Sequence, residues 1–132
     1  MRKIVLIFML LVSASVIAHE SSELNKTMKE MGHTYKLAVK AKTGQEMQDH
    51  LQDLAKLVDK SKTFAFKKEV AAESLVGLNK VLDTVASAER SIAEGDVELA
   101  RQTLLEIDEL RKQYHELHEP PSIWELLFGG GK

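Results

Sequence analysis

The segment EGDVELARQTLLEIDELRKQYHELHEPP, residues 94–121, contains a helix whose start and end are both marked by specific residues. Gly95 can adopt the left-handed conformation that ends a preceding helix, and Asp96 can cap the helix that follows. Apolar residues then recur at intervals of three and four, which is the period of a helix with one buried face. Pro120 stops this pattern, because proline lacks an amide hydrogen and disfavours a helical residue before it. The segment therefore predicts a helix over residues 97–118 that is joined to a preceding helix by a tight turn.

The same period occurs in three earlier segments, where it predicts helices over residues 22–42, 44–61 and 67–94. Thr43 and Glu46 lie three residues apart and form a capping box at the start of the second of these helices. The mature chain contains no stretch with the alternating pattern of a strand. Helices joined by short turns pack antiparallel to their neighbours. The chain is therefore predicted to be all-α, with an antiparallel up-down-up-down four-helix bundle.

Each predicted helix carries a stripe of mostly apolar residues at helical spacing, which is expected to face the core. The stripes consist of Leu24, Met28, Met31, Tyr35 and Ala38 in the first helix, Met47, Leu51, Leu54 and Val58 in the second, Val70, Leu75, Leu78, Leu82, Val85 and Ile92 in the third, and Val97, Ala100, Leu104, Ile107, Arg111, Tyr114 and His118 in the fourth. In the first helix, Lys26, Lys29, Glu30 and Lys36 point away from this stripe.

Residues 1–18 have the pattern of a signal peptide. Arg2 and Lys3 precede an apolar run over residues 4–11, and small residues precede a cleavage position just before His19. The apolar run is shorter than the roughly 20 residues that a helix needs to cross a bilayer, so an N-terminal membrane anchor is the weaker alternative. The chain is therefore expected to be exported to the periplasm.

The mature chain is long enough for one domain with one core, which is predicted to be a bundle over residues 19–120. A short apolar tail follows over residues 121–132. Ser122 and Glu125 form a second capping box within this tail. The tail is expected to dock on the bundle, and the alternative is that it contacts a partner protein or a membrane surface.

The composition excludes several classes of function. The chain contains no cysteine, which rules out disulfides, iron–sulfur clusters and covalent haem attachment through a C-x-x-C-H motif. Without Arg2 and Lys3, the mature chain has 16 basic and 20 acidic residues, a formal net charge of −4. This charge argues against binding to nucleic acid, which needs a basic surface. Neither an H-E-x-x-H zinc motif nor a glycine-rich phosphate loop is present, so an enzyme is not expected.

Met28 and His115 are the two residues that indicate a specific chemistry. They are 87 residues apart, but the predicted antiparallel helices bring both to the same end of the bundle. A methionine sulfur and a histidine imidazole at matched depth can bind the two faces of a haem iron. Taken singly, Met28 also fits a core methionine, and His115 also fits an exposed histidine near a helix end.

Three short motifs give a family resemblance through their order and spacing. They are LNKTMKEM (residues 24–31), EGDVELA (residues 94–100) and RKQYH (residues 111–115). Together they resemble the soluble cytochrome b562 family, and the resemblance covers about residues 23–118. It implies a periplasmic four-helix bundle that binds a b-type haem.

The resemblance also implies the site. One haem b per chain would be held without covalent bonds, with Met28 and His115 as the axial ligands of the iron. Leu78 and Ile107 are expected to contact the haem, and Arg111 is expected to cover its edge or pair with a propionate. Six-coordinate iron leaves no open position, so the expected activity is one-electron transfer, with an unidentified periplasmic donor and acceptor. The protein is expected to be a monomer.

The sequence departs from the family pattern at three places. The connection between the second and third helices is shorter than expected, and it lies at the proposed haem end. Ser74 and Leu78 stand where the family has an aromatic pair, and Phe64 and Phe66 are candidates to compensate. Glu119 stands in place of a basic residue, so a contact from this position to a propionate is not expected.

Two alternative readings of the histidines and one of the whole chain remain open. His118, one turn beyond His115, is a competing ligand for the iron. His115 and His118 with Glu116 or Glu119 could instead chelate a divalent metal at the helix surface. The third alternative is a haem-free periplasmic adaptor, in which Met28 belongs to the core and His115 has no special role.

Overall fold

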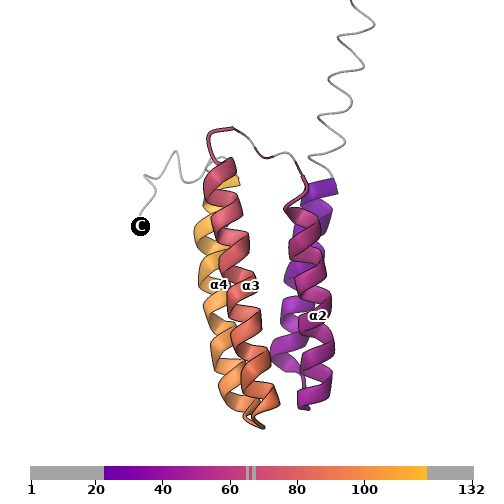
Figure 1. Cartoon of the computed structure of the whole chain (residues 1–132). Coiled ribbons are helices and arrows are strands. Elements are labelled where there is room, and N and C mark those ends of the chain that lie inside the picture. Colours follow the sequence, from indigo (N-terminus) through magenta and orange to yellow (C-terminus); the bar gives the residue numbers. More distant parts are fainter. Residues whose placement is uncertain (1–22, 65, 67, 119–132) are drawn as a thin grey trace, which may run out of the picture.

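The computed structural model of the chain describes residues 23–64, 66 and 68–118, which form a bundle of four helices (Figure 1). The first helix covers residues 23–40, and it is followed by α2 (Gly44–Ser61), α3 (Ala71–Ala93) and α4 (Val97–His118). Successive helices run in opposite directions and pack as two pairs, the first helix with α2 and α3 with α4. The predicted all-α, up-down-up-down four-helix bundle is confirmed.

The two predicted terminal segments, the signal peptide over residues 1–18 and the tail over residues 121–132, lie outside the described residues. Within the described part of the chain, no helix is long and apolar enough to cross a membrane.

The predicted helix ends are formed by the expected capping residues. The backbone N–H of Glu46 donates to the hydroxyl of Thr43 at 3.1 Å, while the Glu46 carboxylate accepts from the N–H of Lys42 at 3.0 Å. In a standard capping box the Glu46 carboxylate would accept from the N–H of Thr43, whereas here it accepts from the N–H of Lys42, the residue before the cap. Gly95 has a φ of 84°, and the carboxylate of Asp96 accepts from the N–H of Leu99 at 2.9 Å. These contacts explain why α2 and α4 begin where predicted.

The prediction for the third helix was wrong at its start. α3 begins at Ala71 rather than at residue 67, and residues 68–70 form a turn. The connection has to cross from one helix pair to the other (Figure 1). Residues 68–70, which periodicity assigned to the helix, belong to this connection.

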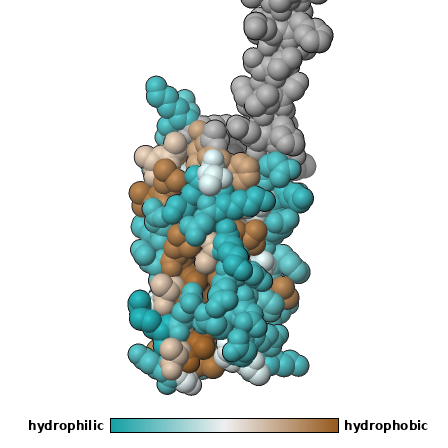
Figure 2. Space-filling model, turned by 45° about the vertical axis from the view of Figure 1, so that its right-hand side comes forward, coloured by the Kyte–Doolittle hydropathy of each residue, from teal (hydrophilic) through white to brown (hydrophobic). Residues whose placement is uncertain are grey.

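The core stripe of α3 also differs from the prediction. Leu75 was expected to face the core, but it is 38% exposed, and Ser74 beside it is buried. The buried face of α3 instead combines small and branched residues: Ser74, Gly77, Leu78, Val81, Thr84, Val85, Ala88 and Ser91. Figure 2 shows hydrophobic side chains exposed in a broken band between hydrophilic ones along one face of the bundle. Periodicity predicted most of the buried face of α3, but it did not show that this face includes Ser74 and leaves out Leu75.

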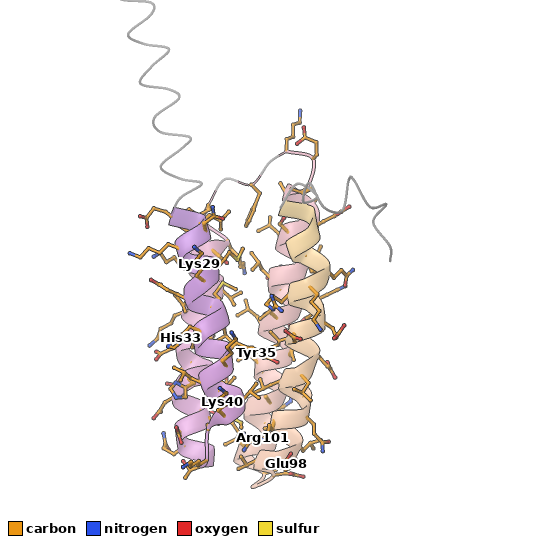
Figure 3. All side chains as sticks on the ribbon, turned by 180° about the vertical axis from the view of Figure 1, so that it is seen from behind. Lys29, His33, Tyr35, Lys40, Glu98 and Arg101 are labelled. Carbon is orange, nitrogen blue, oxygen red and sulfur yellow. The ribbon has the colours of Figure 1, made fainter. Side chains whose placement is uncertain are left out.

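The bundle is closed most firmly at the end where the first helix turns into α2. There the guanidinium of Arg101 on α4 donates to the backbone carbonyls of Val39 and Ala41, with 2.9 Å to Ala41. It also pairs with Glu98 at 3.2 Å (Figure 3). The carbonyls in the last turn of a helix lack partners within the helix, so Arg101 stabilises this terminus and ties it to α4. We call this the Arg101 end, and we call the opposite end, which contains Met28, the Met28 end.

Candidate functional site

Tyr35 and Asp108 define how the first helix and α4 are aligned. The pKa of the Tyr35 phenol is raised, mainly by burial and further by the negative charge of Asp108. Arg111 and Lys112 lower the pKa of the same phenol, so Tyr35 lies near enough to this stretch of α4 to be affected by its charges. In Figure 3, Tyr35 lies on the side of the first helix that faces α4. Tyr35 and Asp108 are therefore at similar heights in the bundle.

This alignment brings the two predicted ligand positions together. Met28 lies seven residues before Tyr35, and His115 lies seven residues after Asp108. Seven residues are close to two helical turns, so each step nearly preserves the face of the helix. Because the two helices are antiparallel, both steps lead toward the Met28 end. The backbone positions of residues 28 and 115 therefore fall at about the same height in the bundle.

The contacts of Arg101 give a second, independent estimate of the alignment. The carbonyls of Val39 and Ala41 accept hydrogen bonds from Arg101. Met28 lies eleven residues before Val39 and thirteen before Ala41. Equal steps along α4 from Arg101 lead to residues 112 and 114. This estimate agrees with the first to within one helical turn.

The side chains around these positions are apolar but only partly enclosed. Leu78 and Ile107, both predicted to contact the haem, are 7% and 5% exposed and belong to the core. Met28 is half-buried, and Leu110 is partly buried against the core. Met47, predicted to be a core methionine, is fully buried at the other end of the bundle. An apolar, incompletely enclosed set of side chains with a few polar groups is typical of a cofactor site.

Arg111 lies on the surface of α4, towards the Met28 end of the bundle. Its side chain is 53% exposed and its guanidinium pairs with Asp108 at 3.0 Å, while Lys112 pairs with the same carboxylate at 3.0 Å. Hydrogen bonds from Lys112 and Arg111 lower the pKa of Asp108. Arg111 was placed on the stripe that faces the core, and its exposure corrects that placement. Its predicted contact with a haem edge or propionate stays a prediction.

Gly77 and Tyr114 form a close contact between α3 and α4 that sequence reasoning missed. Gly77 is buried, and a β-carbon at this position would lie 2.7 Å from the ring atoms of Tyr114. The two residues are the chain neighbours of Leu78 and His115. The ring can lie against α3 only because residue 77 has no side chain, so Gly77 fixes the part of α4 that carries His115. A lone glycine within an otherwise strong helix pattern was the available signal.

Thr27 is a second residue that sequence reasoning missed. It directly precedes Met28 and is 1% exposed, and its hydroxyl has no hydrogen-bond partner among the described residues. A buried polar atom without a partner is rare in folded proteins and needs a specific reason. The spacing of residues along one helix contained no signal for it.

Comparison with known proteins gives the family. A family model described as cytochrome b562 matches residues 23–119. The chain belongs to the cytochrome b562 family. Members of this family are haem-binding electron carriers and not enzymes, so membership implies a haem-binding electron-transfer protein. No match was found among curated proteins or among solved structures.

Two departures from the cytochrome b562 pattern can be followed in the structure. Ser74 is 3% exposed, and its hydroxyl donates to the carbonyl of Val70 at 2.6 Å, so the position of the expected aromatic is closed by a small side chain. Phe66 is partly buried against the core, whereas Phe64 is half-buried outside the core cluster. Phe66 therefore packs against the core, and its role in compensating for the missing aromatics stays a prediction.

The alternative readings of the histidines concern side chains outside the described part of the structure. These are the side chains of His115, Glu116, His118 and Glu119. Among the residues that the structure does describe, no cluster of three or more His, Asp or Glu could hold a metal ion. His118 as a competing ligand and surface chelation by His115 and His118 stay untested.

Proposed function

We propose that this member of the cytochrome b562 family binds one haem b per chain without covalent bonds and transfers single electrons in the periplasm. The residues that would hold its iron are Met28, through the sulfur, and His115, through the imidazole. The observation that carries the proposal is the alignment of the first helix with α4, which follows from the hydrogen bonds of Arg101 to Val39 and Ala41 and agrees with the effect of Asp108 on the pKa of Tyr35. It places the backbone positions of a methionine and a histidine 87 residues apart in the sequence at about the same height in the bundle.

The residues present at the Met28 end fit a haem. A thioether and an imidazole are a known axial pair for haem iron, and both are neutral donors. Leu78 and Ile107 offer buried apolar surface for a flat, apolar ring. The hydroxyl of Thr27, which has no partner among the described residues, is a donor that a propionate carboxylate could satisfy.

Each of these residues has a definite task. When bound, haem supplies a one-electron Fe(III)/Fe(II) couple. Met28 would hold the iron through its thioether, which would favour the ferrous state more than a second imidazole and so raise the reduction potential. Leu78 and Ile107 keep water from one side of the site. Arg111 and Lys112 lie at the rim, where either would offset the charge of a propionate by exchanging its ion pair with Asp108 for one with the propionate.

The periplasmic location rests on residues 1–18, whose charged start, apolar run and small residues before position 19 fit a signal peptide. The intact mass of the exported chain tests it, because cleavage before His19 removes these residues. Recovery of uncleaved chain in a membrane fraction would contradict the proposal.

Absorbance spectra of purified wild type and four variants test the ligands. Wild type is expected to show a Soret band that shifts and sharpens on reduction with dithionite. Met28→Ala should convert low-spin iron toward high-spin and lower the reduction potential, whereas Met31→Ala should change neither. His115→Ala should greatly weaken haem retention, because imidazole is the stronger donor, whereas His118→Ala should leave the spectrum unchanged.

Three outcomes would contradict the assignment. Loss of the low-spin spectrum in His118→Ala but not in His115→Ala would move the histidine ligand by one turn. An unchanged spectrum in both variants would exclude histidine ligation from this segment. A colourless protein that does not bind added haemin would favour the haem-free adaptor.

A further inference from the structure

The outward side of the first helix carries a row of basic residues. Lys26, Lys29, His33, Lys36 and Lys40 are spaced alternately three and four residues apart, so they lie on one face of the helix. All five side chains are exposed, and Figure 3 shows three of them, Lys29, His33 and Lys40, along the first helix. At a rise of about 1.5 Å per residue, the row is roughly 20 Å long. We call these five residues the basic row.

The positive charge of the basic row is not neutralised within the described part of the chain. The ion pairs there involve cations in α2, in α4 and at Lys62, namely in the pairs Lys56–Asp53, Lys62–Asp59, Arg101–Glu98, Arg111–Asp108, Lys112–Asp108 and Lys112–Glu109. None of the four lysines of the row takes part in these pairs. Their ammonium groups therefore remain available to an external anion.

The basic row also stands out against an acidic molecule. Residues 23–40 contain four lysines and two glutamates, which gives this helix a formal charge of +2. α2 contains two basic and four acidic residues. α3 contains two basic and three acidic residues, and α4 contains three basic and five acidic residues. Among the four described helices, the first helix alone is positive. An acidic partner is attracted to one side of the bundle and repelled by the others.

We propose that the basic row is the docking surface for an acidic face of a partner protein that exchanges electrons with this chain. The proposal rests on the proposed function, because it uses the position of the haem. Lys26 and Lys29 lie on either side of Met28 in the sequence, so the row begins at the Met28 end. A partner that lies along the row therefore reaches the Met28 end, on the outward side of the helix that carries the proposed iron ligand. Complementary charge also speeds the diffusional encounter of two proteins and sets their relative orientation.

A protein partner fits the structure better than a lipid surface. A helix that lies on a membrane inserts an apolar face, but the apolar face of the first helix is used by the bundle. Ala38 is fully buried, and Met31 and Tyr35 pack against the core. Leu37 is the one exposed large hydrophobic residue in the described part of this helix. The acidic surfaces of the other helices would also repel a broad anionic bilayer, whereas a partner of limited size meets only the row.

The first experiment measures binding of an oligoglutamate peptide to the full mature chain by backbone NMR at low ionic strength. The test variant replaces the four lysines of the row with glutamine (K26Q/K29Q/K36Q/K40Q). The matched control replaces four exposed lysines elsewhere (K56Q/K60Q/K68Q/K80Q), so that the net charge changes equally. Far-UV circular dichroism checks that both variants are folded.

We expect the peptide to shift amide resonances of the first helix in wild type. The affinity should fall as salt is added, because exposed charges are screened beyond about 10 Å at 0.1 M salt. The test variant should bind about tenfold more weakly, as several exposed ion pairs are lost, and the control less than about threefold more weakly. Equal weakening in both variants, or resonance shifts confined to other helices, would overturn the proposal. Binding to phosphatidylglycerol vesicles through the row, without binding to the peptide, would overturn it in favour of a lipid surface.

A second experiment asks whether the row lies close to the electron-transfer site. Reduced protein is oxidised by hexacyanoferrate(III), an anion, and by tris(phenanthroline)cobalt(III), a cation. The test variant should slow the reaction with the anion severalfold and accelerate the reaction with the cation, whereas the control should change both rates little. Equal rates in the two variants would place the row away from the haem. If the chain binds no haem, the proposed function fails, but the peptide titration still decides whether the row binds acidic protein surfaces.

Discussion

The Thr27 hydroxyl is the buried polar group closest in sequence to the proposed sulfur ligand. It has no partner among the described residues, and an unsatisfied buried hydroxyl costs about 1–3 kcal/mol. The residue before an iron ligand is a position where such a cost can be compensated by a bound group. Haem binding would then change the hydrogen bonding of Thr27 as well as the coordination of Met28.

Thr27→Val is expected to raise the free energy of unfolding of the haem-free protein by about 1 kcal/mol, because valine has the same shape and no polar atom. Urea unfolding followed by circular dichroism measures this change. Thr84→Val is the matched control, since the Thr84 hydroxyl is buried but donates to the carbonyl of Lys80 at 2.9 Å. A loss of stability in Thr27→Val equal to that in the control would show that the hydroxyl has a partner.

Tyr35 offers a direct measurement of the alignment that defines the site. Asp108→Asn removes the negative charge that helps to raise the pKa of Tyr35, so the phenol should ionise at lower pH. Ultraviolet titration of tyrosinate measures this shift, with Tyr35→Phe identifying the signal. Asp53→Asn, on α2, should leave the pKa of Tyr35 unchanged. If Asp108→Asn had no effect, the predicted pairing of Met28 with His115 would lose one of its supports.

The same pKa shift has a consequence for stability. The ordinary pKa of tyrosine is 10.0, and burial and the charge of Asp108 raise that of Tyr35 in the folded chain. The folded state therefore binds this proton more tightly than the unfolded state does. Its contribution to stability is fully present below about pH 10 and is lost as the pH rises through the higher folded value. Tyr35→Phe should show a smaller alkaline loss of stability than wild type.

At the scale of helices, the contact between Gly77 and Tyr114 sets how closely α3 and α4 approach. Gly77→Ala should lower the free energy of unfolding by about 1–2 kcal/mol, because the added methyl group overlaps the ring and this outweighs the better helix propensity of alanine. Gly32→Ala is the matched control. No atom lies within 4 Å of a β-carbon at Gly32, so this variant should gain about 1 kcal/mol.

A second background isolates the ring from other effects of the substitution. With Tyr114→Ala already present, the overlap no longer exists, so Gly77→Ala should become neutral or stabilising by up to about 1 kcal/mol. A penalty of the same size in both backgrounds would mean that the cost does not come from Tyr114. The haem spectrum of Gly77→Ala then reports whether a shift of α4 also disturbs the histidine ligand.

Helix boundaries could be predicted from the sequence where residues close to the boundary determine them. The starts of α2 and α4 follow from Thr43, Asp96 and Gly95, whose effects act within a few residues. The start of α3 could not be predicted, because it depends on the distance that the connection has to cross. Spacing within a helix also could not reveal that Gly77 meets Tyr114, or that the Thr27 hydroxyl is unpaired. Both are properties of helices packed together, whereas Met28 and His115 could be proposed from depth and motif alone.

At the scale of the whole molecule, the two ends of the bundle differ in how they are held. The Arg101 end has charge-assisted hydrogen bonds between the two helix pairs, and the large side chains of Met47 and Leu104 are fully buried. The Met28 end has partly exposed apolar residues and the connection that crosses between pairs. One end therefore fixes the fold, and the other is free to be shaped by the site.

Arg101→Met should lower the free energy of unfolding by about 2 kcal/mol, because two carbonyls of the first helix lose a charged donor while the apolar stem is retained. Arg90→Met is the matched control at an exposed position of α3, and it should change stability by less than about 0.5 kcal/mol. Thermal unfolding of both variants measures the difference. Equal stability of the two would show that Arg101 does not tie the helix pairs together.

The short connections between helices also determine how quickly the chain can find its fold. Most packed neighbours in an antiparallel bundle with tight turns are close in sequence, so little chain entropy is lost before contacts form. Helical domains of this kind have low contact order and fold in microseconds to milliseconds. Both prolines of the chain follow α4 in the sequence, so proline isomerisation within the helices and turns of the bundle cannot add a phase of tens of seconds.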